Sequence, residues 1–195
     1  MIEITIKPDS FVCVPVANVS SFKSSLNGFQ QFSTLPGSRW AASFTWTNRK
    51  GEDARRLRGQ LSGLLGQVGT FKIAIPDSLP LGTASGSGVV DGAGQTGTSL
   101  DTTGWDINQA LLFSAGDWVE IEQQAYTITA DASSDDSGNA TLQITPPLRK
   151  SMSNGSQIVT SGVSFYMRST KNDVGSANVT PGKIYAVSLE GIEID

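Results

Sequence analysis

One amphipathic helix is predicted between Gly51 and Gly69, in a chain whose other patterned segments resemble short strands. At 100° per residue, six apolar side chains of this segment fall within one arc of roughly 100°, the width of a stripe that packs on a core. These side chains are Ala54, Leu57, Leu61, Leu64, Leu65 and Val68. A single helix among strands indicates a sheet protein in which the helix, at about 52–67, covers one face of the sheet.

Alternation of apolar and polar residues predicts strands on both sides of this helix. The clearest strand places four apolar side chains on one face, and we expect it in the interior of a sheet because they bury a large area. They are Trp40, Ala42, Phe44 and Trp46. Half-buried strands are also predicted at 2–6 and 71–75. Pro15 interrupts an apolar run from Phe11 to Val19, which indicates an edge strand or a bulge.

The segment 20–37 differs from these strands, because Ser, Asn, Gly and Gln dominate it. Three phenylalanines, Phe22, Phe29 and Phe32, stand isolated in it as candidate anchors. We expect a long loop there, with at most one short strand. A loop of this length, like an exposed strand edge, is a natural surface for pairing with a neighbouring molecule.

The composition changes at residue 82, where a run rich in Gly, Ser and Thr begins and extends to residue 97. This run lacks the Gly-Lys-Ser/Thr sequence of a phosphate loop, so we interpret it as a flexible connection. Three strands with turns between them follow at 118–122, 125–129 and 141–144, an antiparallel meander. Further strands are predicted at 157–160, 163–168 and from 183 onward. In the last of these, the apolar parity switches at Gly191, as a β-bulge requires.

These segments predict a mostly β protein of two parts. Residues 1–81 and 157–195 form a mostly antiparallel sheet covered by the helix, and residues 82–156 form a small inserted β domain. The chain has no histidine and one cysteine, Cys13. That composition excludes Ser-His-Asp and Cys-His catalysis, His-ligated metals and an internal disulfide. Carboxylate-pair hydrolysis and lysine-assisted serine chemistry remain possible on this composition. No motif in the chain indicates either reaction, so we expect no enzyme, no metal and no cofactor.

Charge and hydropathy narrow the class of partner. The net charge of −4 and the isoelectric point near 4.8 argue against a nucleic-acid partner. The sequence holds no apolar run of 18 residues and no charged-then-apolar N-terminus, so neither a membrane span nor a secretory signal is expected. The only local basic cluster is Arg55, Arg56 and Arg58 on the predicted helix. It is either a solvated helix face or an interface contact.

The inserted domain carries the other candidate sites. Trp105 is interpreted as a core residue, with ligand stacking as the alternative. Trp118 lies beside Glu120 and Glu122, and residues i and i+2 of one strand face are roughly 7 Å apart, within the range of glycosidase carboxylate pairs. A sugar-binding or hydrolytic role is therefore an alternative to an exposed acidic strand face.

An acidic loop follows these strands, with Asp131, Asp135 and Asp136 among Ser, Gly and Asn. It lacks the ligand spacing and the closing glutamate of an EF-hand. We interpret it as a solvated hairpin tip, with calcium binding as the alternative.

A longer pattern resembles a known family. The resemblance rests on the segments Ala115-Gly116-Asp117, 124–130 (QAYTITA) and 137–149 (SGNATLQITPPLR). The order of Pro36-Gly37-Ser38-Arg39-Trp40, an aromatic strand, a helix with Arg55-Arg56-Leu57, and then Phe71 and Ile73 fits the same family. In these features the chain is similar to the distal tail proteins of long-tailed bacteriophages.

The resemblance implies a β-sandwich or split-barrel domain with one helix, assembled as a homo-hexameric ring at the virion tail tip. That ring would join the tail tube protein to the hub and baseplate, and its inserted, barrel-like β domain would project toward receptor-binding proteins or host-surface sugars. Assembly would take place in the host cytoplasm. The family implies no catalytic residue. The alternative left open is a carbohydrate-binding or weakly hydrolytic β domain, with Trp105 and Trp118 as contacts.

Overall fold

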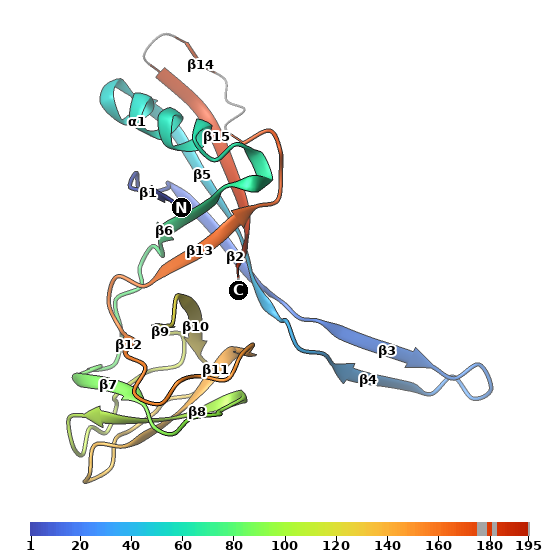
Figure 1. Cartoon of the computed structure of the whole chain (residues 1–195), viewed down its shortest axis with the longest axis vertical. Coiled ribbons are helices and arrows are strands. Elements are labelled where there is room, and N and C mark those ends of the chain that lie inside the picture. The colour runs from blue at the N-terminus through green and yellow to red at the C-terminus, as the bar shows by residue number, and fades with distance from the viewer. Residues whose placement is uncertain (175–178, 181–182, 195) are drawn as a thin grey trace.

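The chain folds into two β lobes and a projecting two-stranded arm (Figure 1). The computed structural model describes residues 1–174, 179–180 and 183–194. The expected mostly β fold, with one covering helix and an inserted barrel-like domain, is confirmed.

The first lobe is built on one seven-stranded sheet. Its main path runs β1-β6-β13-β15-β5-β2, and β14 pairs with β15 outside that path. All neighbours are antiparallel except β1 and β6, which are parallel. The strands are β1 (Ile2–Ile4), β2 (Ser10–Val16), β5 (Arg39–Lys50), β6 (Thr70–Ala74), β13 (Ser164–Ser169), β14 (Val179–Thr180) and β15 (Lys183–Glu193).

The prediction that β5 is an interior strand with one buried apolar face is confirmed. Trp40, Ala42, Phe44 and Trp46 are all buried, and β5 has a neighbour on each side. Pro15 indicates an edge strand or a bulge, and of these two alternatives the structure shows the edge strand, because β2 lies at the sheet edge and pairs with β5 without a register shift. Because proline has no backbone N–H to donate, its place in an edge strand costs no ladder bond on the open side.

One face of this sheet is covered by the helix α1 (Gly51–Ser62), which is shorter than the predicted 52–67. Ala54, Leu57 and Leu61 on α1 are buried against the sheet, but Leu65 and Val68 are 77% and 80% exposed. Leu65 adopts a left-handed φ of 52°, which ends the helical path before the short helix η1 (Gly66–Val68). The prediction that the stripe continues to Val68 is therefore wrong.

The predicted β-bulge at Gly191 is also wrong. The register of β15 on β5 continues without a shift, from Val187 opposite Trp46 to Ile192 opposite Ala41. Glu193 keeps the parity of Val187 and is buried, so a charged residue occupies a core-facing position at the end of the strand. Alternation of apolar residues alone assigns the two faces of β15 wrongly here, because Glu193, a charged residue, occupies a core-facing position.

The second lobe is a six-stranded sheet in the order β12-β9-β10-β11-β8-β7. Its strands are β7 (Gly86–Val90), β8 (Gly97–Trp105), β9 (Trp118–Ile121), β10 (Gln124–Ile128), β11 (Ala140–Leu148) and β12 (Ile158–Val159). The two ends of the sheet meet through a bridge between Val89 and Gln157, so the sheet is a nearly closed barrel around its own apolar core. The predicted meander is confirmed as β9, β10 and β11.

Two boundaries of this lobe differ from the prediction. The glycine-rich run is not a flexible connection throughout, because its residues 86–90 form β7. A Cβ on Gly88 would lie 2.0 Å from Cζ2 of Trp105, so glycine is required where the indole ring lies against the strand. At the other end β12 belongs to the second sheet, and the chain returns to the first sheet only at β13.

The segment predicted as a loop at 20–37 is a β-hairpin. Strands β3 (Val19–Lys23) and β4 (Gln30–Thr34) pair antiparallel and extend away from both lobes (Figure 1). The hairpin continues β2 and β5 beyond a kink at which Asn18 donates from its side chain to the carbonyl oxygen of Pro36, over 2.9 Å. Leu35 also donates to the carbonyl of Asn18. A signal for this hairpin is present in the sequence, because Asn27-Gly28 favours a tight turn.

Candidate interaction surface

The arm formed by β3 and β4 exposes all its strand residues. Its tip is ordered by local hydrogen bonds, in which Ser24 and Phe29 pair through backbone and the side chain of Asn27 accepts from the N–H of Phe29. Gly28 adopts a φ of +72°, a conformation that favours glycine. The arm is therefore a defined hairpin and not an irregular loop.

Apolar side chains lie on both faces of this arm. Phe22 pairs with Gln31, and Ser21 pairs with Phe32. Because directly opposed residues share a face and neighbours along a strand alternate, Phe22 and Phe29 lie on one face and Phe32 on the other. The three rings are 67%, 70% and 66% exposed, and Leu26 at the tip is 96% exposed. Clustered apolar groups of this size mark an interaction surface.

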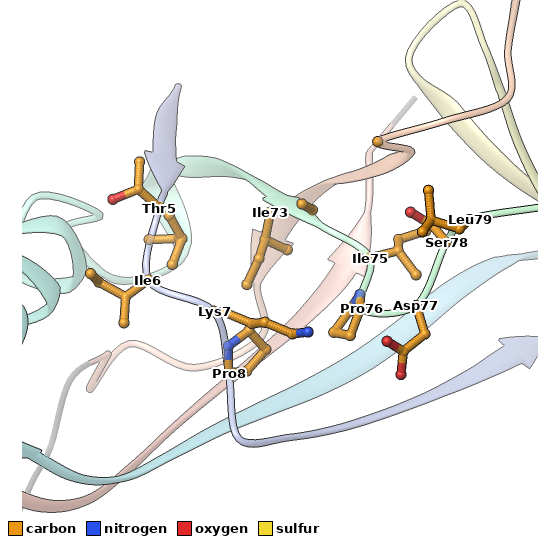
Figure 2. A pocket seen from close by; sticks show the side chains of 13 residues that line it. Thr5, Ile6, Lys7, Pro8, Ile73, Ile75, Pro76, Asp77, Ser78 and Leu79 are labelled. Carbon is orange, nitrogen blue, oxygen red and sulfur yellow. The ribbon is translucent and has the colours of Figure 1, made fainter.

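A second apolar feature lies where β1 and β6 separate. The two strands pair in parallel only from Ile2 opposite Phe71 to Ile4 opposite Ile73. Beyond these residues the chain segments diverge and leave a groove of about 370 Å³, which we call the notch (Figure 2). Ile4, Ile73 and Ile75 are among the buried residues that line it, and Leu79 on its rim is 76% exposed.

The three arginines predicted as a basic cluster lie on the solvent side of α1. Arg55, Arg56 and Arg58 are all exposed. Arg56 forms an ion pair with Glu52 one turn earlier, at 2.6 Å, and both side chains remain more than half exposed. Exposed pairs of this kind stabilise a helix only slightly. This arrangement is typical of a solvated helix face, and it leaves the three side chains accessible to an interface contact, the alternative prediction.

Trp105 is a core residue of the second lobe, as predicted from the sequence. It is 5% exposed, its indole N–H donates to the hydroxyl of Thr102 at 2.8 Å, and its ring meets Phe113 edge-on with centroids 5.1 Å apart. Its ring faces are therefore covered by protein. Ligand stacking, the alternative for this residue, needs an exposed ring face.

Trp118 joins the two lobes. It begins β9 in the second lobe, but its ring packs against Trp40 and Phe165 of the first lobe, with centroids 5.0 and 5.6 Å apart. The indole N–H of Trp40 donates to the carbonyl of Ala125 across the same joint, at 2.9 Å. Trp118 is therefore partly buried, with its ring packed against the first lobe where the two lobes meet.

Glu120 and Glu122 do not form a carboxylate pair on one strand face. Glu120 is buried and accepts from the backbone N–H of Ser164 at 3.0 Å. Strand β9 ends at Ile121, and Glu122 lies in the following turn with a φ of 48°. Its carboxylate accepts from the hydroxyl of Ser156 at 2.6 Å, and this bond is the main cause that lowers its pKa. The predicted shared face is therefore wrong, because Glu122 is a turn residue with a left-handed backbone and no longer follows the alternation of the strand.

Two aspartates of the acidic loop bind backbone. Asp135 accepts from the N–H groups of Ser137 and Asn139, at 2.9 and 2.8 Å, and Asp131 accepts from the N–H of Ala115 at 2.8 Å. In the described ranges 1–174, 179–180 and 183–194, no three acidic or cysteine side chains gather as metal ligands would. Asp135 also lines a polar cleft of about 680 Å³.

A buried ion pair lies where the two lobes meet, and it was not predicted from the sequence. The carboxylate of Glu193 lies 3.2 Å from the guanidinium of Arg149 and also accepts from the N–H of Ala125, at 2.9 Å. Burial raises the pKa of the Glu193 carboxyl, while Arg149 and the N–H donors act in the opposite direction. The signal that was available is the core-facing parity of Glu193 in β15.

Comparison with protein-family models and with curated proteins finds no match to this chain. Among the residues that the structure describes, no helix has the length and apolar character needed to traverse a bilayer.

Proposed function

We propose that this chain is a structural protein of a long-tailed bacteriophage, a ring subunit at the distal end of the tail. In this role six copies form a closed ring that joins the tail tube to the hub and baseplate. The bacteriophage assignment rests on the sequence resemblance at 115–117, 124–130 and 137–149. The subunit role rests on the arm.

The arm is the single observation that carries the proposed self-association. Its exposed side chains are Phe22, Leu26, Phe29 and Phe32, each exposing about two thirds of its surface or more. At roughly 200 Å² for an aromatic side chain, they offer on the order of 500 Å² of apolar surface. A standard interface takes about 800 Å² from each partner, and the arm can supply part of this area from each of its two faces. Repeated contacts of this kind build a ring when their rotation closes.

The inserted lobe suits a projecting position in such a ring. It has its own apolar core and is linked to the first lobe by two chain segments, at 75–85 and 160–163. In this role it contacts neighbouring tail or receptor-binding proteins. Against the glycan-binding alternative, Trp105 is buried in the second lobe, and the ring of Trp118 is partly buried against Trp40 and Phe165.

The test is the native mass of the purified protein, with negative-stain images of the same sample. We expect a species of six chains, each of 20.5 kDa, with a total of about 123 kDa, and closed rings in the images. An antibody against the chain is expected to label the distal tail end of virions that carry it. A monomer at all concentrations together with unlabelled tail tips would contradict the proposal.

A further inference from the structure

We infer that one flank of helix α1 in one copy docks in a cleft on the second lobe of the next copy. The donor side chains are Arg55 and Arg58, which we call the cationic flank. The acceptor is the polar cleft of about 680 Å³ that Asp91, Asp101 and Asp135 line, which we call the acidic cleft. This inference rests on the proposed ring and adds a second contact to it, because the arm supplies only part of a standard interface.

Charge is divided unequally along the chain. Residues 1–81 contain nine Lys and Arg and five Asp and Glu, whereas residues 82–148 contain nine Asp and Glu and no Lys or Arg. The next two bases, Arg149 and Lys150, form ion pairs with Glu193 and Glu122. Six acids of the second lobe are exposed, namely Asp91, Asp101, Asp106, Asp131, Asp135 and Asp136. The second lobe of one copy therefore attracts a basic surface of another, over about 10 Å in 0.1 M salt.

The cationic flank carries charge that is not neutralised within one copy. Arg55 and Arg58 are three residues apart, so their side chains are neighbours on the helix surface. Both are exposed, and within the described ranges neither forms an ion pair, whereas Arg56 pairs with Glu52. A Cβ built on Gly59, beside this flank, meets nothing within 4 Å. The flank is therefore an unpartnered helix face with room for a partner.

The acidic cleft gathers carboxylates on one side of the barrel-like sheet. Asp91 follows β7, and its N–H donates to the carbonyl of Asp101 in β8, at 2.9 Å. Their carboxylates therefore leave neighbouring positions of two paired segments, where like charges repel. Asp135 lines the same cleft, and two backbone N–H groups fix its carboxylate. Guanidinium groups placed here relieve the repulsion and donate charge-assisted hydrogen bonds.

Two arginines of one helix suit this cleft better than a metal ion does. Among the residues that the structure describes, no three acidic side chains are grouped closely enough to hold one ion. Carboxylates that are spread along a cleft cannot share a single cation, but two guanidinium groups can each reach a different carboxylate. The chain itself supplies these two groups in Arg55 and Arg58, in equal number to the cleft. A second copy is therefore the occupant.

The two surfaces lie at opposite ends of the molecule. Figure 1 shows α1 at one end, and the second lobe with β7 and β8 at the other. The contact therefore cannot close within one copy. Because the two surfaces are unlike, the contact is heterologous, and each copy donates its helix to one neighbour and accepts the helix of another. This is the kind of contact that produces a ring when its rotation closes.

Charge reversal on each surface, and then on both, tests this contact. The helix variant carries Arg55→Glu and Arg58→Glu, and the cleft variant carries Asp91→Lys and Asp101→Lys. All four positions are exposed, so both variants are expected to fold, which circular dichroism checks. Each variant alone is expected to associate at least about tenfold more weakly in sedimentation velocity, because like charges then face each other. An equimolar mixture of the two variants, and a chain with all four substitutions, are expected to recover to within about threefold of the unchanged protein, because opposite charges meet again.

Matched controls separate the two surfaces from the overall charge of the protein. Asp106 and Asp136 are exposed acids of the second lobe that do not line the acidic cleft. Asp106→Lys with Asp136→Lys changes the net charge as the cleft variant does, and is expected to assemble like the unchanged protein. Arg168→Glu with Lys171→Glu, at two exposed bases outside α1, is the corresponding control for the helix variant.

The outcomes distinguish this inference from the proposed function. If the unchanged protein assembles and both reversed variants assemble equally well, the helix-to-cleft contact is overturned while the ring proposal stands. If both variants fail and neither the mixture nor the four-substitution chain recovers, the pairing of these two surfaces is overturned. If EDTA abolishes assembly of the unchanged protein, the cleft holds a divalent cation instead, which also overturns the inference. If the unchanged protein never assembles, the ring proposal and this contact both fail.

A carbodiimide cross-link gives an independent readout, because it joins an amine to a carboxylate only where the two are in contact. Arg58→Lys keeps the positive charge and supplies the amine. In this variant, mass spectrometry is expected to find position 58 of one copy joined to Asp91 or Asp101 of another, in bands of two or more linked copies on a denaturing gel. Cross-links from position 58 that reach only other acids contradict the contact.

Discussion

At Gly191 the absence of a side chain is a packing requirement. A Cβ built there would lie 2.6 Å from Cζ of Phe71 and 3.1 Å from Cβ of Met167, both fully buried. Phe71 also meets Phe44 edge-on, with ring centroids 6.4 Å apart. Glycine at this position therefore makes room for an aromatic ring of a strand two places away in the same sheet. It is not the site of a bulge.

Gly191→Ala is expected to destabilise the protein by about 1–3 kcal/mol, because the added methyl group overpacks a filled core. The matched control is Gly59→Ala on α1, where an added Cβ meets nothing within 4 Å. That control is expected to stabilise the protein by about 0.5–1 kcal/mol, because alanine has the higher helix propensity. Chemical denaturation of both variants measures the two free energies of unfolding. Equal effects would contradict the packing explanation.

At the scale of elements, the apolar pattern predicts the packed face of a helix or strand more reliably than it predicts the residue at which the element ends. The first turns of α1 follow the predicted stripe, but the helix stops at Ser62, with Gly63 as its C-terminal cap and Leu65 in a left-handed conformation. A Cβ on Gly69 would lie 2.1 Å from the carbonyl oxygen of Leu64, so the chain folds tightly back at that point. This local turn of the chain overrides the remaining helix pattern.

Deleting the arm is expected to leave the body of the protein intact. Val19 and Thr34 face each other across the hairpin, so an Asn-Gly turn can replace residues 20–33. None of the removed residues is buried, and the thermal midpoint of the monomeric body is expected to change by no more than a few degrees. Differential scanning calorimetry measures this midpoint. A large loss of stability would show that the arm supports the body and is not primarily an interaction element.

At the scale of the whole molecule, the two lobes are joined by a polar and aromatic contact. Trp118 packs between Trp40 and Phe165, and the Glu193–Arg149 ion pair lies within the same joint. Glu193 also accepts from Ala125 of β10. These contacts connect the end of the first sheet with two strands of the second. We expect the lobes to unfold together in a single calorimetric transition.

Trp118→Ala is expected to split that transition into two, because it removes the aromatic contact between the lobes. Because Trp118 is only partly buried, the overall cost is expected to fall below the about 3–5 kcal/mol of a fully buried tryptophan. Leu142→Ala is the matched control, since Leu142 is fully buried in the core of the second lobe. This control is expected to lower the midpoint and keep one transition. A single transition in Trp118→Ala would contradict the coupling.

Sequence patterns alone determined the β class, the interior strand from Trp40 to Trp46 and the meander of the inserted lobe, and they limited the strand of Pro15 to an edge or a bulge. Each of these depends on local alternation or on a missing backbone donor, which neighbouring residues report directly.

Only the tertiary structure decided the rest. It showed that the segment with Phe22 is a projecting arm, that Gly88 makes room for Trp105, and that Glu193 is a core-facing ion-pair partner. It also placed the notch where β1 and β6 diverge. These features depend on contacts between residues far apart in the chain, such as Gly88 with Trp105 and Arg149 with Glu193. Local periodicity carries no information about which distant side chain fills a given space, because packing and burial are set by the assembled fold.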